Sequence, residues 1–269
     1  MTLISFFGVA LPGYALVRSI WPESDWNLGG SVSTSAIQPL DLVVVGGYVA
    51  LFVLNWKVLV ARMAEATLQV PTVGGVLGGS FGFLLIAAVI PAVLFWRINL
   101  NEFFGLRWDQ WKQALWIVPC FVLGMMLLLV VMNQLGWHSW VESNYGAKPQ
   151  VMVKLLKETP NMALVAAIVF SAVIVAPIAE EIIFRGYIYP VVKRYTERWF
   201  AGLFSGLLFG VIHFNLMGLP QLALMGIVLV VLYELTGSLW VTIGCHAAFN
   251  GTTVGLVLLD RIYEFPGTS

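Results

Sequence analysis

Two neighbouring carboxylates and an arginine interrupt an apolar part of the chain that runs from Met162 to Val192. Glu180, Glu181 and Arg185 stand there in the stretch AEEIIFRGY. Ionisable groups are costly in such surroundings, so they mark functional or paired positions. Adjacent residues of a helix point about 100° apart, whereas residues four apart share a face. We therefore expect Glu181 to pair with Arg185, and Glu180 to face a cavity as a general base.

Two more polar interruptions follow within apolar segments. His213 lies in FGVIHFN, one helical turn after Phe209, and His246 lies one turn before Asn250 in CHAAFNG. The chain has three histidines, and two of them occupy these positions. A single histidine on a membrane helix more often forms a structural hydrogen bond than a catalytic site. The case for chemistry therefore depends on the three stretches together.

Helix geometry predicts that these polar groups meet. With a rise of about 1.5 Å per residue, Glu180 and His213 each lie about 20 Å from the segment ends at Lys193 and Trp199. His246 lies about 12 Å from the start of the last apolar segment. In an up-and-down bundle these three ends share one side of the membrane, so the groups converge at similar depths.

Such a group of side chains suits hydrolysis. A water molecule would be activated by Glu180 and His213, while His246 and Asn250 would polarise the carbonyl group and stabilise the oxyanion. Glu180, His213 and His246 could instead hold a metal ion, because imidazole and carboxylate are ordinary Zn²⁺ ligands. A Zn²⁺ cofactor and a metal-free reaction are both compatible with the sequence. The charged stretch could also be a buried ion network or a helix end among lipid headgroups.

The composition indicates an integral membrane protein. Of the 269 residues, 59% are hydrophobic and 10% are charged, a balance that a soluble domain could not bury. Apolar windows of about 20 residues, the length that an α-helix needs to cross the hydrocarbon core, recur along the chain. The formal net charge is zero and no run of Lys and Arg exceeds two residues, so nucleic acid is not an expected partner. The expected partners are membrane lipid and a protein or peptide substrate.

We predict an all-α, polytopic transmembrane bundle of about seven or eight helices in a single domain, residues 1–269. Residues 1–160 would form N-terminal helices, an interfacial helix and a polar loop, and residues 161–259 would form the catalytic core helices. The segment Asn101–Trp116 mixes charged and aromatic residues, which is typical of an amphipathic helix among the headgroups. The segments expected to be apolar helices are about 40–61, 73–96, 115–135, 161–192, 199–217, 220–235 and 238–259, and residues 1–21 are interpreted as a retained first segment.

The polar loop 136–160 is expected to lie at the membrane surface. Its tail, residues 151–157, is a candidate for a short surface helix. Trp137 and Trp140 are interpreted as interfacial anchors.

Three motifs resemble, in order and spacing, those of the CPBP family: Glu180-Glu181-x-x-x-Arg185, Phe209-x-x-x-His213 and His246-x-x-x-Asn250. This family groups type II CAAX prenyl proteases with bacteriocin-processing and related Abi proteins. The resemblance covers about residues 162–259. It implies an all-helical intramembrane endopeptidase that cleaves a membrane-associated or lipidated protein or peptide, with or without a metal ion. It also implies a multi-pass protein, in the plasma (inner) membrane if the source is prokaryotic, with a functional set of Glu180, His213, His246 and Asn250.

Two other functions stay open on the sequence alone. A non-catalytic member of the same family could act as a bacteriocin immunity factor, scaffold or regulator, with a pocket that binds without turnover. A proton-coupled transporter would also place Glu, Arg and His inside the membrane. A transporter predicts repeated halves with interrupted helices, and no internal repeat is visible. The chain contains no H-E-x-x-H motif, so it does not carry the zinc site of site-2 type proteases.

Overall fold

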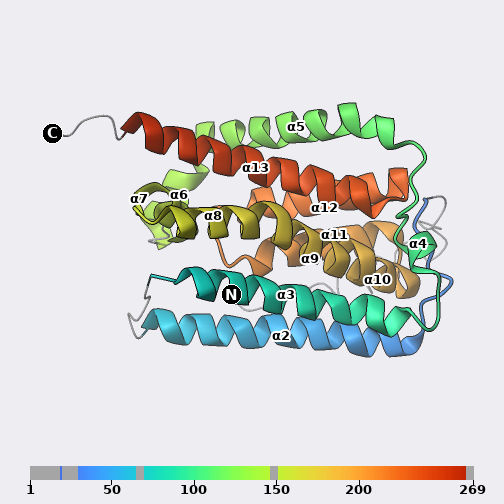
Figure 1. Ribbon diagram of the computed structural model, residues 1–269. Helices are drawn as coiled ribbons and strands as arrows, with labels where there is room; N and C mark the ends of the chain where they lie inside the picture. The colour runs from blue at the N-terminus through green and yellow to red at the C-terminus, as the bar shows by residue number, and fades with distance from the viewer. Residues whose placement is uncertain (1–18, 20–29, 65–69, 146–150, 265–269) are drawn as a thin grey trace.

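The computed structural model describes residues 19, 30–64, 70–145 and 151–264, and the regular structure in these ranges is helical throughout (Figure 1). The predicted all-α class is confirmed. Five of the described helices are long and apolar enough to cross a membrane: Val73–Leu94, Trp111–Gln134, Met162–Tyr195, Leu219–Thr236 and Leu239–Tyr263. Two shorter apolar helices, Pro39–Asn55 and Arg198–Ile212, accompany them. The chain is therefore an integral, multi-pass membrane protein. The expected first segment, residues 1–21, lies outside the described residues apart from Ser19.

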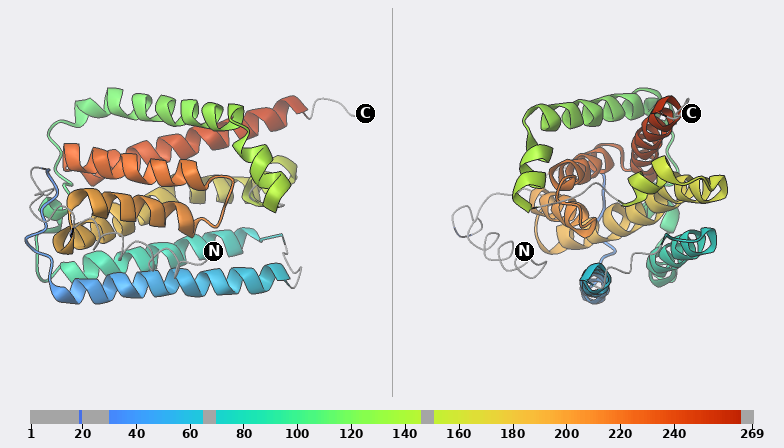
Figure 2. Two further views of the ribbon diagram at one scale, coloured as in Figure 1. Left: turned by 180° about the vertical axis from the view of Figure 1, so that it is seen from behind. Right: turned by 90° about the vertical axis from the view of Figure 1, so that its left-hand side faces the viewer.

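Helices α2 (Pro39–Ala64) and α3 (Val73–Leu94) lie along one edge of the bundle, and α5 (Ala114–Gln134) lies at the opposite edge (Figures 1 and 2). The Tyr48 hydroxyl donates to the Ile86 carbonyl at 2.6 Å and links α2 to α3. The elements that carry the predicted site residues lie between these two edges (Figure 1).

The central element is one continuous helix with two widened, π-helical turns. Its glutamates lie on α9, between these turns, and each turn precedes a proline, Pro177 or Pro190. Proline lacks an N–H group and crowds the carbonyl four residues earlier, and a widened turn accommodates both defects. The parts in chain order are α8 (Met162–Phe170), η2 (Ser171–Val175), α9 (Ala176–Ile183), η3 (Phe184–Ile188) and α10 (Tyr189–Tyr195).

Helices α11 (Arg198–Ile212) and α12 (Leu219–Thr236) pack with their backbones in contact. A Cβ atom added at Gly226 would lie 2.7 Å from the Cα atom of Gly206, closer than real Cβ atoms approach. Small residues at helix crossings allow such close packing in membranes. The short connector between α11 and α12 thus joins two helices that pack directly on each other. Helix α13 (Leu239–Glu264) then packs against α5, α9 and α12.

The amphipathic surface helix is not where the sequence predicted it. Within Asn101–Trp116 the structure has only the end of the one-turn helix α4 (Leu100–Phe103), the short 3₁₀ helix η1 (Trp111–Gln113) and the start of α5. Gly105 ends α4 because its backbone adopts φ +60° and lies against the Gly237 carbonyl, where a Cβ atom would be 1.6 Å away. The Leu239 amide also donates to the Phe104 carbonyl at 2.9 Å. Because Phe104 and Gly105 contact the α12–α13 connector, the chain does not form one continuous helix over residues 101–116.

The surface helices lie later in the chain instead. Helix α6 (Trp137–Tyr145) follows α5, and α7 (Val151–Glu158) confirms the short helix expected near residues 151–157. On α7, Leu156 is buried and Lys154 is exposed, so α7 is amphipathic.

Candidate active site

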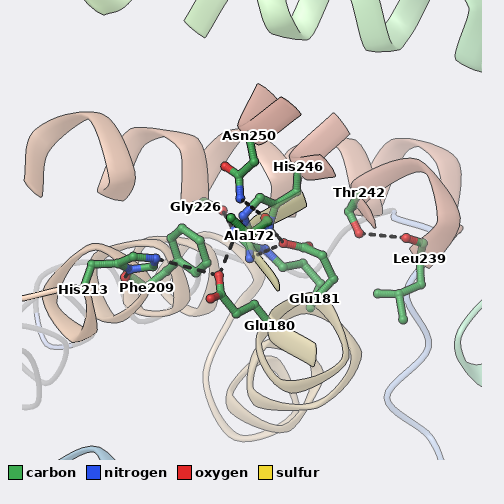
Figure 3. Close-up of polar contacts among 11 residues, drawn as sticks. Ala172, Glu180, Glu181, Phe209, His213, Gly226, Leu239, Thr242, His246 and Asn250 are labelled. Carbon is green, nitrogen blue, oxygen red and sulfur yellow. Dashed lines mark hydrogen bonds and ion pairs between the residues drawn. The ribbon is translucent and has the colours of Figure 1, made fainter. Parts of the chain in front are cut away.

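Three elements bring the predicted site residues together. Glu180 projects from α9, His213 lies at the C-terminal end of α11, and His246 and Asn250 project from α13 (Figure 3). The convergence expected from helix geometry is therefore present in the structure.

The Glu180 carboxylate faces both imidazole rings. Its Oε2 atom lies 3.8 Å from His213 Nε2 and 3.7 Å from His246 Nε2. The same oxygen is buried and accepts no hydrogen bond from the described protein atoms. These distances exceed those of direct hydrogen bonds. They suit a small polar group, such as a water molecule, that contacts the carboxylate and the rings at once.

His213 occupies a helix end rather than a helix interior. The sequence predicted a helix to about residue 217, but α11 ends at Ile212 because Phe214 adopts φ 51° in the left-handed region. His213 Nδ1 lies 2.6 Å from the Phe209 carbonyl oxygen. Since a carbonyl can only accept, Nδ1 carries the proton and a neutral ring has its lone pair on Nε2. That lone pair is directed toward Glu180.

His246 is oriented by the second glutamate. Its Nδ1 atom lies 2.9 Å from Glu181 Oε1, and its side chain is 3% exposed. The same carboxylate oxygen accepts a hydrogen bond from Arg185 Nη1 at 2.8 Å, so the predicted Glu181–Arg185 pair is present. Glu181 therefore contacts both the arginine and the histidine. The sequence did not reveal the second contact, because it joins different helices across 65 positions.

Arg185 and Phe209 form the interior wall of the site. The Arg185 guanidinium is fully buried, donates from Nη2 to the Gly226 carbonyl at 3.1 Å, and lies 4.5 Å from the centre of the Phe209 ring. This is the geometry of a cation–π contact. The Phe209 ring also packs against the rings of His213 and His246, at centroid distances of 4.7 and 5.6 Å. Phe209 thus fixes both imidazoles from one side.

Asn250 is anchored differently from the other three predicted site residues. Its Nδ2 atom donates to the Ala172 carbonyl of η2 at 2.8 Å. No direct hydrogen bond joins it to Glu180, His213 or His246 among the described residues. One of its two amide hydrogens is therefore occupied, and the other is available to a ligand. Asn250 lies beside the site, one turn after His246 (Figure 3).

The imidazole and carboxylate groups of the site are of the types that bind Zn²⁺. Both histidines have Nδ1 bonded to an acceptor, a pattern common among metal-binding histidines. Within residues 19, 30–64, 70–145 and 151–264, however, no group of three or more His, Cys, Asp and Glu side chains is placed to hold a metal ion. Glu180, His213 and His246 are the residues that would hold a metal ion if one were bound, and we derive the chemistry from the side chains.

A buried contact outside the predicted set holds the glutamate helix in place. The Tyr187 hydroxyl, from the stretch AEEIIFRGY, donates to Asp41 Oδ1 at 2.6 Å, and Arg97 Nη2 lies 2.6 Å from the same oxygen. Asp41 is fully buried. A carboxylate near the start of an apolar segment was the available signal in the sequence, since buried charges require partners.

The G-x-S-x-G stretch that ends at Gly82 does not form a nucleophile elbow in the structure. The residues Gly78-Gly-Ser80-Phe-Gly82 have the G-x-S-x-G spacing of α/β-hydrolases. They lie inside helix α3 rather than on a strand-to-helix turn. The Ser80 hydroxyl donates to the Val76 carbonyl and pairs with the Ser171 hydroxyl, which makes it a link between α3 and η2.

Comparison with known proteins gives two matches. Residues 162–252 match the family model described as "Type II CAAX prenyl endopeptidase Rce1-like". The chain is also 34% identical over 116 residues to "Putative membrane peptidase YdiL" of Bacillus subtilis (strain 168). That match covers 43% of this chain and 45% of the relative, so the chain covers less than half of the relative's length. No solved structure matches the chain.

Proposed function

We propose that this chain, whose core helices are similar to those of type II CAAX prenyl endopeptidases, hydrolyses a peptide bond of a membrane-associated or lipidated protein or peptide. The observation that carries the proposal is the buried Glu180 Oε2 atom, which faces the Nε2 atoms of His213 and His246 at 3.8 and 3.7 Å. A carboxylate between two imidazoles can accept a proton from water at the moment of attack.

Charge balance assigns different tasks to the two histidines. Two carboxylates and one guanidinium leave one net negative charge in the buried site, and one additional proton balances it. That proton is best placed on His246, whose ring lies between Glu181 and Glu180. A doubly protonated His246 donates through Nδ1 to Glu181 and through Nε2 into the site. His213 keeps a lone pair on Nε2 and serves with Glu180 as an acceptor.

The reaction then follows from these tasks. Water attacks the carbonyl carbon and gives a proton to Glu180, while His246 and the second amide hydrogen of Asn250 stabilise the oxyanion. When the intermediate collapses, the C–N bond breaks and the proton held by Glu180 passes to the leaving amine. The products are an acid and an amine. Glu181 remains ionised throughout, paired with Arg185.

The test uses the full chain in proteoliposomes with three internally quenched fluorescent peptides. The peptides are a farnesylated C-a-a-X peptide, its unlipidated counterpart and an apolar spanning peptide, because the substrate class is part of the question. We expect cleavage of at least one of them, and we expect Glu180→Gln and His213→Ala to lower its kcat by at least about 100-fold. The matched controls are Glu142→Gln and His138→Ala on α6, which change the same residue types away from the site.

Two outcomes would redirect the proposal. Peptide binding without turnover in the parent protein would favour the non-catalytic alternative. Cleavage that disappears after chelation and returns only with Zn²⁺ would replace the Glu180-activated water with a metal-bound one. We expect instead that chelated protein with substoichiometric metal content retains its turnover.

A further inference from the structure

His213 depends on an irregular connector for its position. Glu180, His246 and Asn250 all lie within helices, but residues 213–218 form the link from α11 to α12. The last turn of α11 continues only to the Phe214 amide, which donates to the Val211 carbonyl at 3.1 Å. Phe214 then leaves the helical region at φ 51°, a costly conformation for a bulky residue unless its surroundings hold it.

The connector is held from within and from outside. Within it, the Gly218 amide donates to Asn215 Oδ1 at 3.2 Å and closes a turn. From outside, the indole Nε1 of Trp137 donates to the Met217 carbonyl at 2.9 Å. This second bond joins α6 to the connector across 80 positions of sequence.

Helix α6 is itself fixed to the bundle and can serve as a rigid support. It begins directly after Gly136, whose φ of +69° makes the turn out of α5. Val141 is fully buried and packs α6 onto the body of the protein. The Trp137 ring stacks on the Trp140 ring, with centroids 5.4 Å apart and an interplanar angle of 28°. The Nε1 donor atom of Trp137 is thus held in one place.

We propose that Trp137 is a positioning residue: through the Met217 carbonyl it fixes the connector 213–218 and keeps the His213 ring at its distance from Glu180. This role goes beyond interfacial anchoring, and Trp137 lies outside residues 162–252 that match the family. The inference rests on the proposed peptidase activity. Since small displacements of a catalytic group reduce turnover steeply, a single distant hydrogen bond can affect the rate.

The test compares Trp137→Phe with Trp140→Phe in the full chain in nanodiscs. Both variants keep an aromatic ring on α6, but only the first removes the donor to Met217. We expect Trp137→Phe to lower kcat roughly tenfold with KM little changed, and to accelerate amide hydrogen exchange in residues 213–218. Trp140→Phe should change neither quantity, because a phenyl ring at position 140 still offers a face for Trp137 to stack on and the Trp137 donor to Met217 is retained. Benzothienylalanine at position 137, which keeps the shape of indole without its N–H group, should reproduce the effect if the phenylalanine variant folds poorly.

Equal exchange rates or equal kcat values in the two variants would overturn the inference. Exchange does not depend on turnover, so this measurement separates the two proposals. If the parent protein cleaves none of the peptides, the peptidase proposal fails and the role of Trp137 in catalysis fails with it. Exchange alone then decides whether the connector is held by Trp137.

Discussion

Glu181 joins the structural and chemical parts of the site in a single carboxylate. Its Oε1 atom is the acceptor for both Arg185 and His246, and all three side chains are at most 3% exposed. Adjacent positions on a helix thus give the two glutamates different tasks. Glu180 faces the two imidazole rings, and Glu181 contacts His246 and Arg185; in the proposed mechanism Glu181 supplies the negative charge that balances a protonated His246.

Glu181→Gln should therefore impair stability and turnover together. The substitution removes the carboxylate that pairs directly with the buried Arg185 guanidinium, which costs roughly 3 to 5 kcal/mol. It also removes the charge that stabilises protonated His246, so we expect kcat of the folded fraction to fall by at least about 100-fold. Thermal unfolding in detergent and turnover per folded molecule check the two effects separately.

Arg185→Leu provides the comparison for Glu181→Gln. It removes the guanidinium but keeps the Glu181–His246 contact, so stability should fall while the remaining folded protein retains more turnover than Glu181→Gln does. Equal turnover in the two variants would show that the contact with His246 has no catalytic role.

At the scale of elements, sequence patterns predict the apolar helices well but not the contacts that end or widen them. The apolar segments and their order follow from composition, and the structure confirms them. The prediction of an interfacial helix over 101–116 was wrong because Gly105 packs against Gly237, more than a hundred positions away in the sequence. The end of α11 was misplaced because Phe214 adopts a conformation that its residue type disfavours. Likewise, helix faces predict the Glu181–Arg185 pair, whereas the Glu181–His246 contact needs the packing of α9 on α13.

A hydrogen bond from Asn250 to the Ala172 carbonyl links the π-helical turn η2 to α13. Asn250→Ala should lower the free energy of unfolding by about 1 to 2 kcal/mol, because that carbonyl loses its interhelical donor. It should also lower kcat, because the second amide hydrogen of Asn250 is lost with the first.

The control for Asn250→Ala is Thr252→Val. The Thr252 hydroxyl donates to the Ala248 carbonyl of its own helix, so its removal breaks no link between elements. Chemical denaturation and peptide turnover of both variants give the comparison. A stable Asn250→Ala variant with reduced kcat would mean that Asn250 acts on the substrate alone and does not stabilise the packing of α13 on η2.

At the scale of the whole molecule, stabilising charges and the reactive groups lie at different places along the bundle. One end contains the buried Asp41 cluster and a second cluster in which Glu234 Oε1 accepts hydrogen bonds from Lys193 and Tyr189, each at 2.5 Å. Lys193 also donates to the Val32 carbonyl at 3.0 Å and so connects α10 to the chain before α2. Helix α6 and the connector 213–218 lie toward the other end (Figure 1).

This separation predicts that the Lys193–Glu234 pair affects stability without affecting chemistry. Lys193 lies 13 residues after Glu180 on a continuous helix, about 20 Å along its axis. Lys193→Met leaves the buried Glu234 carboxylate without the ammonium group of Lys193 and should cost roughly 3 to 5 kcal/mol of stability. The double variant Lys193→Met/Glu234→Gln keeps an acceptor for Tyr189 and should recover more than half of that loss. Unfolding experiments measure the stability, and kcat per folded molecule should equal the parent value in both variants.

A normally stable Lys193→Met variant with reduced kcat would instead connect this end of the bundle to the site. The most direct connection would be the continuous helix through α9 and α10, which carries both Glu180 and Lys193.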